Sequence, residues 1–318
     1  MSKTCVSVSA AANIALIKYW GKETGPGNQP ATGSLSIGLE GLRTETTLAI
    51  SDEQSDLIDF TDSEASTSRI VSYFEEIRDL FNFTHHFVLT SRNFFPTGTG
   101  LASSASGFAA LAIALDNLLQ LELSDKEISR LAMRGSGSAA RSIYGGFVEV
   151  VKEQDAFARQ IQPANFWPLG IIVAITNPNK KAISSTDAMR QTQLNSPFYK
   201  TWLHTHNADM ETAQDALMSR DFAKLADVSE SNCMKMHASI MTSRPSIIYW
   251  HPATLAIIRR IQELRNNGLP CFFTIDAGAQ VKIIFEPAAL DAVKDGLSDI
   301  QGIKQLIETQ VGGEPKVL

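Results

Sequence analysis

Apolar positions in the first half of the chain follow two periods, one typical of strands and one typical of helices. A period of two, or a short continuous apolar run, predicts strands over residues 5–20, 44–50, 85–94, 147–151 and 169–176. The helical spacing of the apolar residues from Ile70 to Phe81 predicts a helix over residues 66–83. This half is therefore expected to mix strands and helices.

Two further helices are expected after a stretch rich in glycine and serine. Residues 107–121 are rich in Ala and Leu and predict the first of them. In the second, over residues 123–135, Ser124 and Glu127 have the spacing of a capping box, and Gly135 is the expected stop.

The second half of the chain begins after a polar, turn-rich connector over residues 177–182, which predicts a boundary between domains 1–180 and 181–318. Helices are expected from there to about residue 242. The remaining order is helix, strand, strand, helix and strand, over residues 253–268, 271–276, 280–286, 288–297 and 304–310. It predicts helices packed on one face of a mostly antiparallel sheet, an α+β arrangement.

Composition and charge narrow the range of partners. With 44% hydrophobic and 19% charged residues, the 318-residue chain can bury a sizeable core. Its net charge is −6 and no block of basic residues offsets this, which argues against a nucleic-acid partner. A phosphate-bearing ligand would therefore have to be held by a local concentration of donors.

The N-terminal segment, the length of the apolar runs and the cysteines together predict a cytoplasmic location for the protein. The first 22 residues lack a continuous apolar segment, which argues against a signal peptide. The apolar runs, such as residues 168–176 (PLGIIVAIT), are shorter than the roughly 20 residues that cross a bilayer. Cys5, Cys233 and Cys271 are odd in number and show no CxxC spacing, so we interpret them as buried thiols in a reducing compartment. We expect a cytoplasmic protein with no membrane partner.

Residues 95–107, FPTGTGLASSASG, place glycines and hydroxyl side chains, without any charge, directly before a predicted helix. The first N–H groups of a helix have no intrahelical partner, and glycines let the backbone approach a ligand closely. The stretch therefore predicts a polyphosphate cradle. It is not a P-loop, which needs a lysine, nor the dinucleotide pattern, whose third glycine would fall at Ser103. The alternative is a helix entry capped by serines.

A second segment, residues 12–22 (ANIALIKYWGK), carries polar side chains on and just after an apolar strand. They are Asn13, Lys18, Tyr19 and Lys22. Burying Lys18 without a partner would be costly, which points to a ligand or a counter-charge. The alternative is a strand edge whose lysines reach back to solvent.

A third segment, residues 134–146 (RGSGSAARSIYGG), places Ser136, Ser138 and Arg141 in another glycine–serine turn. A planar guanidinium in such a turn suits a carboxylate or a phosphate. The alternative is a plain connector between two helices.

Two acidic positions complete the candidate site. In residues 272–283 (FFTIDAGAQVKI), Asp276 stands at a strand end, where it is either a base or an ordinary turn residue. Ser184 and Asp187 have capping-box spacing, so a helix is expected to begin there and to offer N–H groups to an anionic substrate, or to be capped and nothing more.

Together these segments resemble the GHMP kinase superfamily and, within it, the mevalonate diphosphate decarboxylase family. KYWGK and GSGSAARSIYGG are characteristic of the decarboxylases, and PTGTGLASSASG is similar to the phosphate loop of the superfamily. The resemblance covers most of the chain. It implies a two-lobed α+β fold, with an N-terminal part like domain 2 of ribosomal protein S5 and a ferredoxin-like C-terminal part. The implied reaction uses ATP to convert mevalonate 5-diphosphate to isopentenyl diphosphate, phosphate and CO2.

The resemblance also implies roles for individual residues. Asp276 would meet the substrate 3-hydroxyl as a base or an orienting group, Arg141 would hold the substrate carboxylate, and Asn13 would assist them. The substrate would be bound by Lys18, Tyr19, Lys22, Ser136, Ser138, Ser185 and Met189. ATP would be held by Thr97, Gly98, Thr99, Gly100, Leu101, Ser103 and Ser104.

The implied cofactors and partners follow from the same resemblance. ATP would act with Mg²⁺, for which Ser103 or Ser104 is the candidate ligand, and Lys180 or Lys181 would add charge near the nucleotide. The implied assembly is a homodimer.

Two departures from the family pattern bear on the substrate. The family commonly has two alanines within the stretch where this chain has Thr-Gly-Thr-Gly, and an arginine in an SSRDGM pattern where this chain has Thr186, followed by Ala188. One cation near the diphosphate is then missing unless Arg190 or another segment replaces it. A monophosphate substrate would need less positive charge.

Two rival functions remain open on the sequence alone. The first is a kinase that stops after phosphorylating a mevalonate-type substrate, and the second is a non-catalytic nucleotide-binding protein. The presence of both Asp276 and Arg141 favours the complete decarboxylation over either rival. A serine hydrolase is disfavoured because GxSxG is absent.

Overall fold

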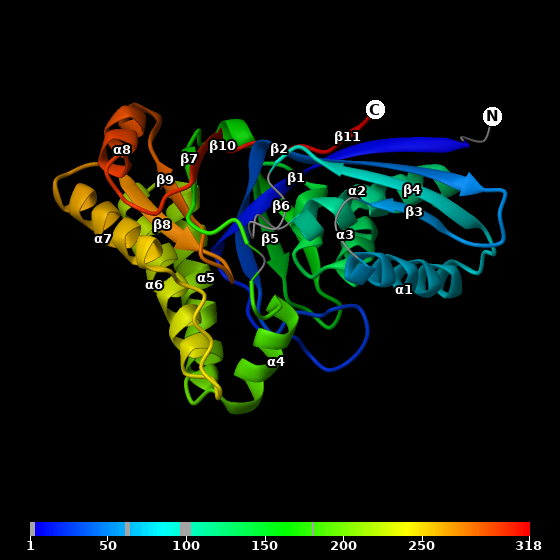
Figure 1. Ribbon diagram of the computed structural model, residues 1–318, viewed down its shortest axis with the longest axis horizontal. Coiled ribbons are helices and arrows are strands. Elements are labelled where there is room, and N and C mark those ends of the chain that lie inside the picture. Colours follow the sequence, from blue (N-terminus) through cyan, green and yellow to red (C-terminus); the bar gives the residue numbers. More distant parts are fainter. Residues whose placement is uncertain (1–3, 61–63, 96–102, 180) are drawn as a thin grey trace.

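The structure is a computed structural model that describes residues 4–60, 64–95, 103–179 and 181–318. These residues form two lobes side by side, each built around a sheet that helices cover (Figure 1). Strands β1 and β2 run through the middle of the molecule, and the C-terminus lies at the upper edge of the N-terminal lobe in this view. None of the helices within the described residues is long and apolar enough to span a bilayer.

The N-terminal lobe contains a seven-stranded sheet in which long strands join two halves. Its strands are β1 (Cys5–Ile17), β2 (Ser34–Ser51), β3 (Leu57–Phe60), β4 (His86–Asn93), β5 (Phe147–Val151), β6 (Phe157–Gln162) and β11 (Lys316–Val317). Five of them follow the order β11-β1-β2-β4-β3, and β5 pairs with both β2 and β6. Strand β2 pairs with β5 along its first residues and with β4 along its last ones, so one strand belongs to both halves.

Three helices cover one face of this sheet. They are α1 (Glu64–Phe81), α2 (Ser103–Leu119) and α3 (Asp125–Gly135), and a 3-10 turn, η1 (Ala139–Ile143), follows them. Helix α2 is buried along most of its length because its Ala and Leu side chains pack against Val8 of β1 and Leu48 of β2. Its first residue, Ser103, is thereby held at the inner edge of the lobe.

The C-terminal lobe contains a four-stranded antiparallel sheet in the order β10-β7-β9-β8. Its strands are β7 (Gly170–Ile175), β8 (Cys271–Ile275), β9 (Val281–Phe285) and β10 (Gln305–Gln310). The helices of this half are α4 (Ser185–Asn195), α5 (Tyr199–Ser219), α6 (Phe222–Met241), α7 (Pro252–Asn266) and α8 (Leu290–Leu297). Two short 3-10 turns, η2 (Ala164–Phe166) and η3 (Pro287–Ala289), complete the described elements.

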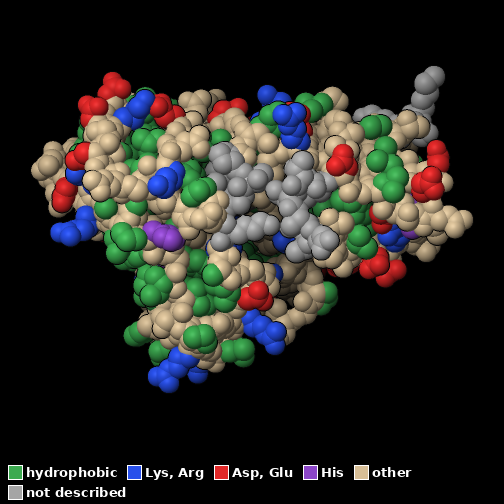
Figure 2. Space-filling view, in the orientation of Figure 1, with side chains coloured by type: hydrophobic (Ala, Val, Ile, Leu, Met, Phe, Trp, Pro, Cys, Tyr) green, Lys and Arg blue, Asp and Glu red, His purple; other side chains and the backbone are tan. Residues whose placement is uncertain are grey.

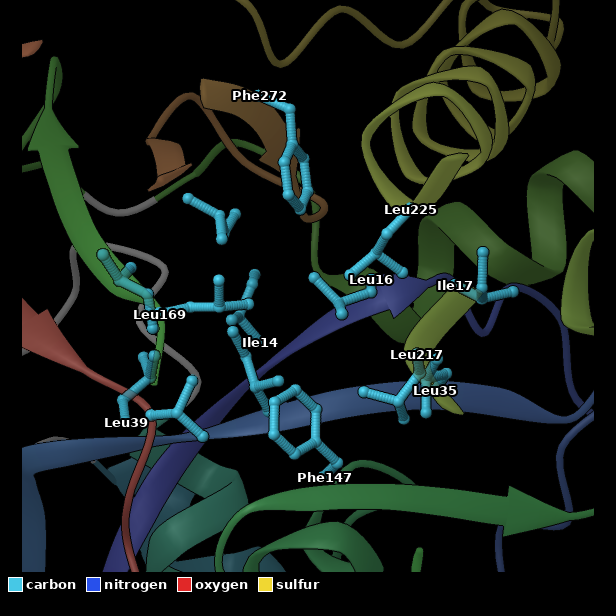
Figure 3. Packing of buried hydrophobic residues seen from close by; sticks show 14 of the residues in the cluster. Ile14, Leu16, Ile17, Leu35, Leu39, Phe147, Leu169, Leu217, Leu225 and Phe272 are labelled. Atoms are coloured by element: carbon cyan, nitrogen blue, oxygen red, sulfur yellow. The ribbon is translucent and has the colours of Figure 1, made fainter. Parts of the chain in front are cut away.

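The two sheets share one apolar core. Helices α7 and α8 pack on the outer face of the second sheet through Ile257 and Val293. Its inner face presents Phe272 to a cluster that also contains Ile14 of β1 and Leu35 of β2 (Figure 3). The lobes are therefore joined by continuous packing, which fixes the residues at the ends of β1 and β8 relative to each other.

The structure confirms most of the predicted elements. The capping box of α3 is present, with the Ser124 N–H donating to Glu127 Oε2 at 2.8 Å. Strands β3, β6 and β11 were not predicted because they are short or rich in polar residues and carry little periodic signal. Strand β2 begins at Ser34 rather than at residue 44, because glycines and Glu40 interrupt its alternation. The domain boundary at residue 180 stays a prediction.

The interpretation of three buried thiols is wrong for Cys5. All three cysteines are free, and Cys233 and Cys271 are buried, but Cys5 is exposed. Cys5 is the first residue of β1, where the strand has not yet entered the core.

Candidate active site

A cleft of about 1000 Å³ lies between the two lobes, and residues of both lobes line it. Its walls come from the end of β1, the start of α2, the turn between α3 and η1, the segment before α4, and the turn after β8. In the space-filling view the cleft is the dark hollow near the centre of the face, with Lys or Arg side chains visible inside it (Figure 2). Every segment singled out from the sequence contributes described residues to it.

The charges that line the cleft are strongly unbalanced. Asp276 is the one acid among the described lining residues. The cations that line it are Lys18, Lys22, Arg69, Arg141 and Lys181. A concave site with an excess of cations concentrates anionic ligands, although the chain as a whole carries a charge of −6.

Asp276 lies at the end of β8 between two lysines. Lys18, directly after β1, places its Nζ 2.9 Å from Asp276 Oδ1, and Lys282 of β9 places its Nζ 3.5 Å from Asp276 Oδ2. Both lysine side chains are buried, whereas the Asp276 side chain is 30% exposed toward the cleft. Burial alone would raise the pKa of the Asp276 carboxyl, but Lys18, Lys282 and Arg141 together hold it well below its ordinary value. The carboxylate is therefore a fixed anion and a weak base.

Arg141 stands in η1, buried at the wall of the cleft. Its Nε donates to Asn13 Oδ1 at 3.0 Å and its Nη1 donates to Ser34 Oγ at 2.9 Å. Asn13 is fixed in turn, because its Nδ2 donates to Ser142 Oγ at 2.7 Å. No hydrogen bond joins Nη2 to another part of the chain that the structure describes. The guanidinium is thus clamped on one side and has a donor left for a ligand on the other.

Tyr19 and the Ser136–Ser138 turn meet on the same wall. A Cβ placed on Gly137 would lie 2.6 Å from the Tyr19 hydroxyl oxygen, so this close approach requires glycine between the two serines. Ser136 Oγ lies 3.3 Å from both Ser104 Oγ and Ser138 Oγ. The hydroxyls form a continuous row of donors that a phosphate could use.

Lys22 lines the same cleft. Its Nζ donates to Asn28 Oδ1 at 2.7 Å and to Thr186 Oγ1 at 3.3 Å. Its backbone is held by Gln193 of α4, which accepts from the Lys22 N–H at 3.1 Å and donates to the Lys22 carbonyl at 2.7 Å. Burial and the neighbouring Arg69 lower the pKa of Lys22.

The start of α4 faces the cleft. Ser184 caps the helix by accepting from the Asp187 N–H at 3.1 Å, as its spacing predicted. Lys181 donates to Ser185 Oγ at 2.5 Å and to the Ala277 carbonyl at 3.1 Å, which brings this lysine next to Asp276. Met189, one turn into α4, is buried and forms an apolar part of the lining.

Of the predicted ATP-binding residues, Thr97, Gly98, Thr99, Gly100 and Leu101 lie outside the described residues. Ser103 and Ser104 open the first turn of α2, face the cleft, and have no acidic side chain beside them in that turn. Free N–H groups and serine hydroxyls without a neighbouring carboxylate fit a polyphosphate. Within the described residues no group of three or more His, Cys, Asp or Glu could hold a metal ion. A Mg²⁺ held mainly by phosphate oxygens, with one serine hydroxyl, fits this donor set.

Comparison with known families decides what kind of protein carries this cleft. Residues 10–160 match the diphosphomevalonate decarboxylase-like N-terminal domain, and residues 171–318 match the mevalonate 5-diphosphate decarboxylase C-terminal domain. The chain belongs to the diphosphomevalonate decarboxylase family.

Curated relatives of this family align along nearly the whole chain. The diphosphomevalonate decarboxylase of Gibberella zeae is 32% identical over 330 residues, which cover 94% of this chain and 86% of the relative. The phosphomevalonate decarboxylase of Haloferax volcanii is 30% identical over 314 residues, which cover 95% of this chain and 94% of the relative. Both kinds of decarboxylase are therefore similar to this chain.

Solved structures of the family superpose closely. One, described as MDDEF in complex with MVAPP, AMPPCP and magnesium, has a TM-score of 0.92 at 36% identity and covers 99% of each chain. The mevalonate diphosphate decarboxylase from Staphylococcus aureus has a TM-score of 0.93 at 34% identity, covering 99% of this chain and 98% of the other. These comparisons confirm the family, the enzyme class and the two-lobed α+β fold predicted from the sequence.

Two cations in or behind this decarboxylase cleft were not predicted from the sequence. Arg69 of α1 lines the cleft, donates to the Gly135 carbonyl and places its guanidinium carbon 5.0 Å from the centre of the Phe108 ring. Arg190, the sequence candidate for a replacement cation, is exposed on α4 and does not line the cleft. Lys282 was missed as well, although a lysine in the middle of the apolar run QVKIIFE is the same signal that singled out Lys18.

Proposed function

We propose that this member of the diphosphomevalonate decarboxylase family converts mevalonate 5-diphosphate to isopentenyl diphosphate in the central cleft, with ATP as cosubstrate and Mg²⁺ as its cation. The observation that most supports this proposal is that Asp276 and Arg141, far apart in sequence, face the same cleft. Among the described residues that line it, the other charged side chains are all cations. The predicted function agrees with the family and with the names of the relatives.

The first step is transfer of the γ-phosphoryl group of ATP to the substrate 3-hydroxyl, with ADP as the leaving group. Asp276 accepts a hydrogen bond from this hydroxyl, aims its oxygen at the phosphorus, and takes its proton once the new O–P bond has made that oxygen strongly acidic. Because the pKa of Asp276 is held low, its contribution is orientation rather than strong basicity. This suffices for a loose transition state, in which positioning and charge stabilisation supply most of the rate.

The second step is loss of phosphate and CO2. Phosphate leaves with the electrons of its bond to the tertiary carbon, and the electrons of the carbon–carboxylate bond form the new double bond. Arg141 holds the carboxylate through Nη2 while Asn13 and Ser34 fix the guanidinium. A clamp on the carboxylate also stabilises the ground state, so its main role is to set the angle of the breaking bond.

The nucleotide end is assigned to the start of α2. Ser103 and Ser104 would hold phosphate oxygens, together with Thr97 to Leu101, which lie outside the described residues. Ser103 would also be a ligand of Mg²⁺, which would neutralise charge on the β- and γ-phosphates when bound.

The 5-phosphate end is assigned to the wall that carries Tyr19, Lys22 and the Ser136–Ser138 turn. Lys22 and Arg69 give this wall two cations, and the N-terminus of α4, with Ser185 as its first residue, adds N–H groups. Two cations favour a diphosphate. The uncharged Thr186 beside Lys22 favours a monophosphate instead.

A substrate comparison tests the proposal. Mevalonate, its 5-phosphate and its 5-diphosphate are offered separately with ATP and Mg²⁺, and ADP and CO2 are both followed. We expect kcat/KM to be highest for the diphosphate, by about tenfold or more over the monophosphate, since a charge-assisted contact contributes about 1.5–3 kcal/mol. ADP and CO2 should form in equal amounts.

The other outcomes contradict specific parts of the proposal. ADP without CO2 would identify a kinase, and no turnover with any of the three would identify a binding protein. A higher kcat/KM for the monophosphate would transfer the substrate assignment to phosphomevalonate.

Lys181 gives the reaction a predicted pH dependence. Much of this side chain is exposed, but its ammonium group lies among Ser185, Ala277 and the Tyr249 ring, and the loss of water there lowers its pKa to about 8. The cation is present below this pKa and is lost as the pH rises through it, so affinity for the anionic substrates should fall above about pH 8.

The matching measurement is kcat/KM between pH 6 and 10 for wild type and Lys181→Arg. Wild type should show an alkaline decline near pH 8, and the arginine variant, which stays charged, should lose that decline. An unchanged decline in Lys181→Arg would assign it to another group.

Assembly, compartment and domain division stay proposals. The homodimer rests on the family resemblance and is checked by light scattering on the purified chain. A cytoplasmic location is supported by the three free thiols. The division at residue 180 is supported by the polar connector alone and is checked by limited proteolysis.

A further inference from the structure

Lys282 is a buried lysine that the proposed reaction does not use. It lies in the middle of β9, opposite Thr274 of β8, and its side chain is 3% exposed. Its neighbours Val281 and Ile283 belong to the core of the C-terminal lobe. Within the described residues, its one ion-pair partner is the Asp276 carboxylate, 3.5 Å from its Nζ.

Lys282 is a second cation beside a carboxylate that needs only one to balance its charge. Lys18 already neutralises the carboxylate at 2.9 Å. Moving a second ammonium group out of water is costly, and an apolar side chain in the same place would avoid that cost. A purely structural role therefore does not account for a lysine here.

Each oxygen of Asp276 faces its own ammonium group. Oδ1 is paired with Lys18 and Oδ2 with Lys282, and these two contacts fix both the position and the plane of the carboxylate. Lys18 is itself anchored, because its Nζ also donates to the Ala15 carbonyl at 2.8 Å. Lys282 is anchored by the strand pairing of β8 with β9.

Other groups near Asp276 cannot replace Lys282. Cys233 and His237 of α6 face the same strand end, where both contact the Ile275 carbonyl. Burial raises the pKa of the Cys233 thiol and lowers the pKa of His237 to about 3, so both are uncharged at neutral pH. Arg141 and Lys181 line the cleft itself, where the proposed function places the substrate.

We infer that Lys282 is a positioning residue for phosphoryl transfer, which holds Asp276 Oδ2 from behind so that the carboxylate faces the substrate hydroxyl. The inference rests on the proposed function. Lys282 does not line the cleft and touches no substrate, so its effect should fall on kcat rather than on substrate affinity.

The test compares Lys282→Met with wild type in the ADP and CO2 assay. Methionine keeps most of the length and volume but removes the charge. We expect kcat to fall by about 10- to 100-fold, as for a misplaced catalytic group, while KM for ATP and for the phosphorylated mevalonate stays within about threefold. Lys282→Arg, which keeps the cation, should restore kcat to within about threefold of wild type.

Thr274→Val is the matched packing control. Thr274 is fully buried and pairs with Lys282 across the two strands, so this variant disturbs the same place without removing a charge. It should lower the melting temperature but leave kcat within about twofold of wild type. If Lys282→Met does not fold, Lys282→Gln takes its place in the same measurements.

The outcomes separate this inference from the proposed function. No turnover by wild type overturns the proposed function. Normal wild-type turnover with an unaffected Lys282→Met, or Lys282→Gln where methionine does not fold, overturns the inference alone. A loss of kcat that Thr274→Val reproduces, or that Lys282→Arg does not restore, shows packing rather than positioning and also overturns it.

Discussion

Asp276→Asn is expected to lower kcat by about 10²- to 10⁴-fold for both ADP and CO2, the range for a group that handles a reacting proton. Asparagine keeps the shape of the side chain but removes the anion that Lys18 and Lys282 hold in place. The substrate 3-hydroxyl then loses its acceptor, and two buried ammonium groups are left facing a neutral amide. Single-turnover measurement of ADP and CO2 checks the expected loss.

Asp56→Asn is the control for this variant. Asp56 is a buried carboxylate of the N-terminal lobe, paired with Arg78 and His86 and absent from the cleft lining. It should lower the melting temperature, because it breaks an ion pair, but leave kcat within about twofold. Turnover of Asp276→Asn within tenfold of wild type would remove Asp276 from the centre of the mechanism.

Arg141→Lys is expected to lower kcat/KM for the phosphorylated mevalonate by about 10²- to 10³-fold. Lysine keeps the charge but cannot donate at once to Asn13, Ser34 and a substrate carboxylate. Breaking such a buried, hydrogen-bonded charge contact costs about 2–5 kcal/mol. KM for ATP should change little. Steady-state kinetics with each substrate varied in turn checks both statements.

Arg265→Lys is the matched control for Arg141→Lys. Arg265 of α7 makes a two-pronged contact with Glu230 and lies outside the cleft. This variant should cost stability and leave kcat/KM within about twofold. A kcat/KM of Arg141→Lys within about tenfold of wild type would contradict the assignment of Arg141 to the substrate carboxylate.

The sequence predicted much of the fold from local signals. Capping residues act over three positions, so Ser124 and Ser184 marked the starts of α3 and α4 correctly. Long periodic segments such as α1 and α7 were predicted because their apolar faces repeat many times. The short strands β3 and β11 were not predicted, because a segment of two to four residues is too short to show a repeating pattern of apolar positions.

The candidate site was only partly accessible to sequence reasoning. Lys18 and Asp276 could be selected singly, as a buried cation and as an acid at a strand end. Lys282 gave the same signal as Lys18 and was overlooked among its apolar neighbours. Arg69 gave no such signal in the sequence, because an arginine on an amphipathic helix is usually only a solvated residue.

By itself the sequence determined where most of the long helices and strands form, which segments carry unusual polar residues, and which family they resemble. Only the tertiary structure decided that Lys18 and Asp276, separated by 258 positions, share a salt bridge, that Lys282 supports the same carboxylate, and that Arg69 rather than Arg190 reaches the cleft. The physical reason is the range of the forces involved. Capping and periodicity act between neighbours along the chain, whereas the charge environment of the cleft depends on how two sheets pack around one shared core.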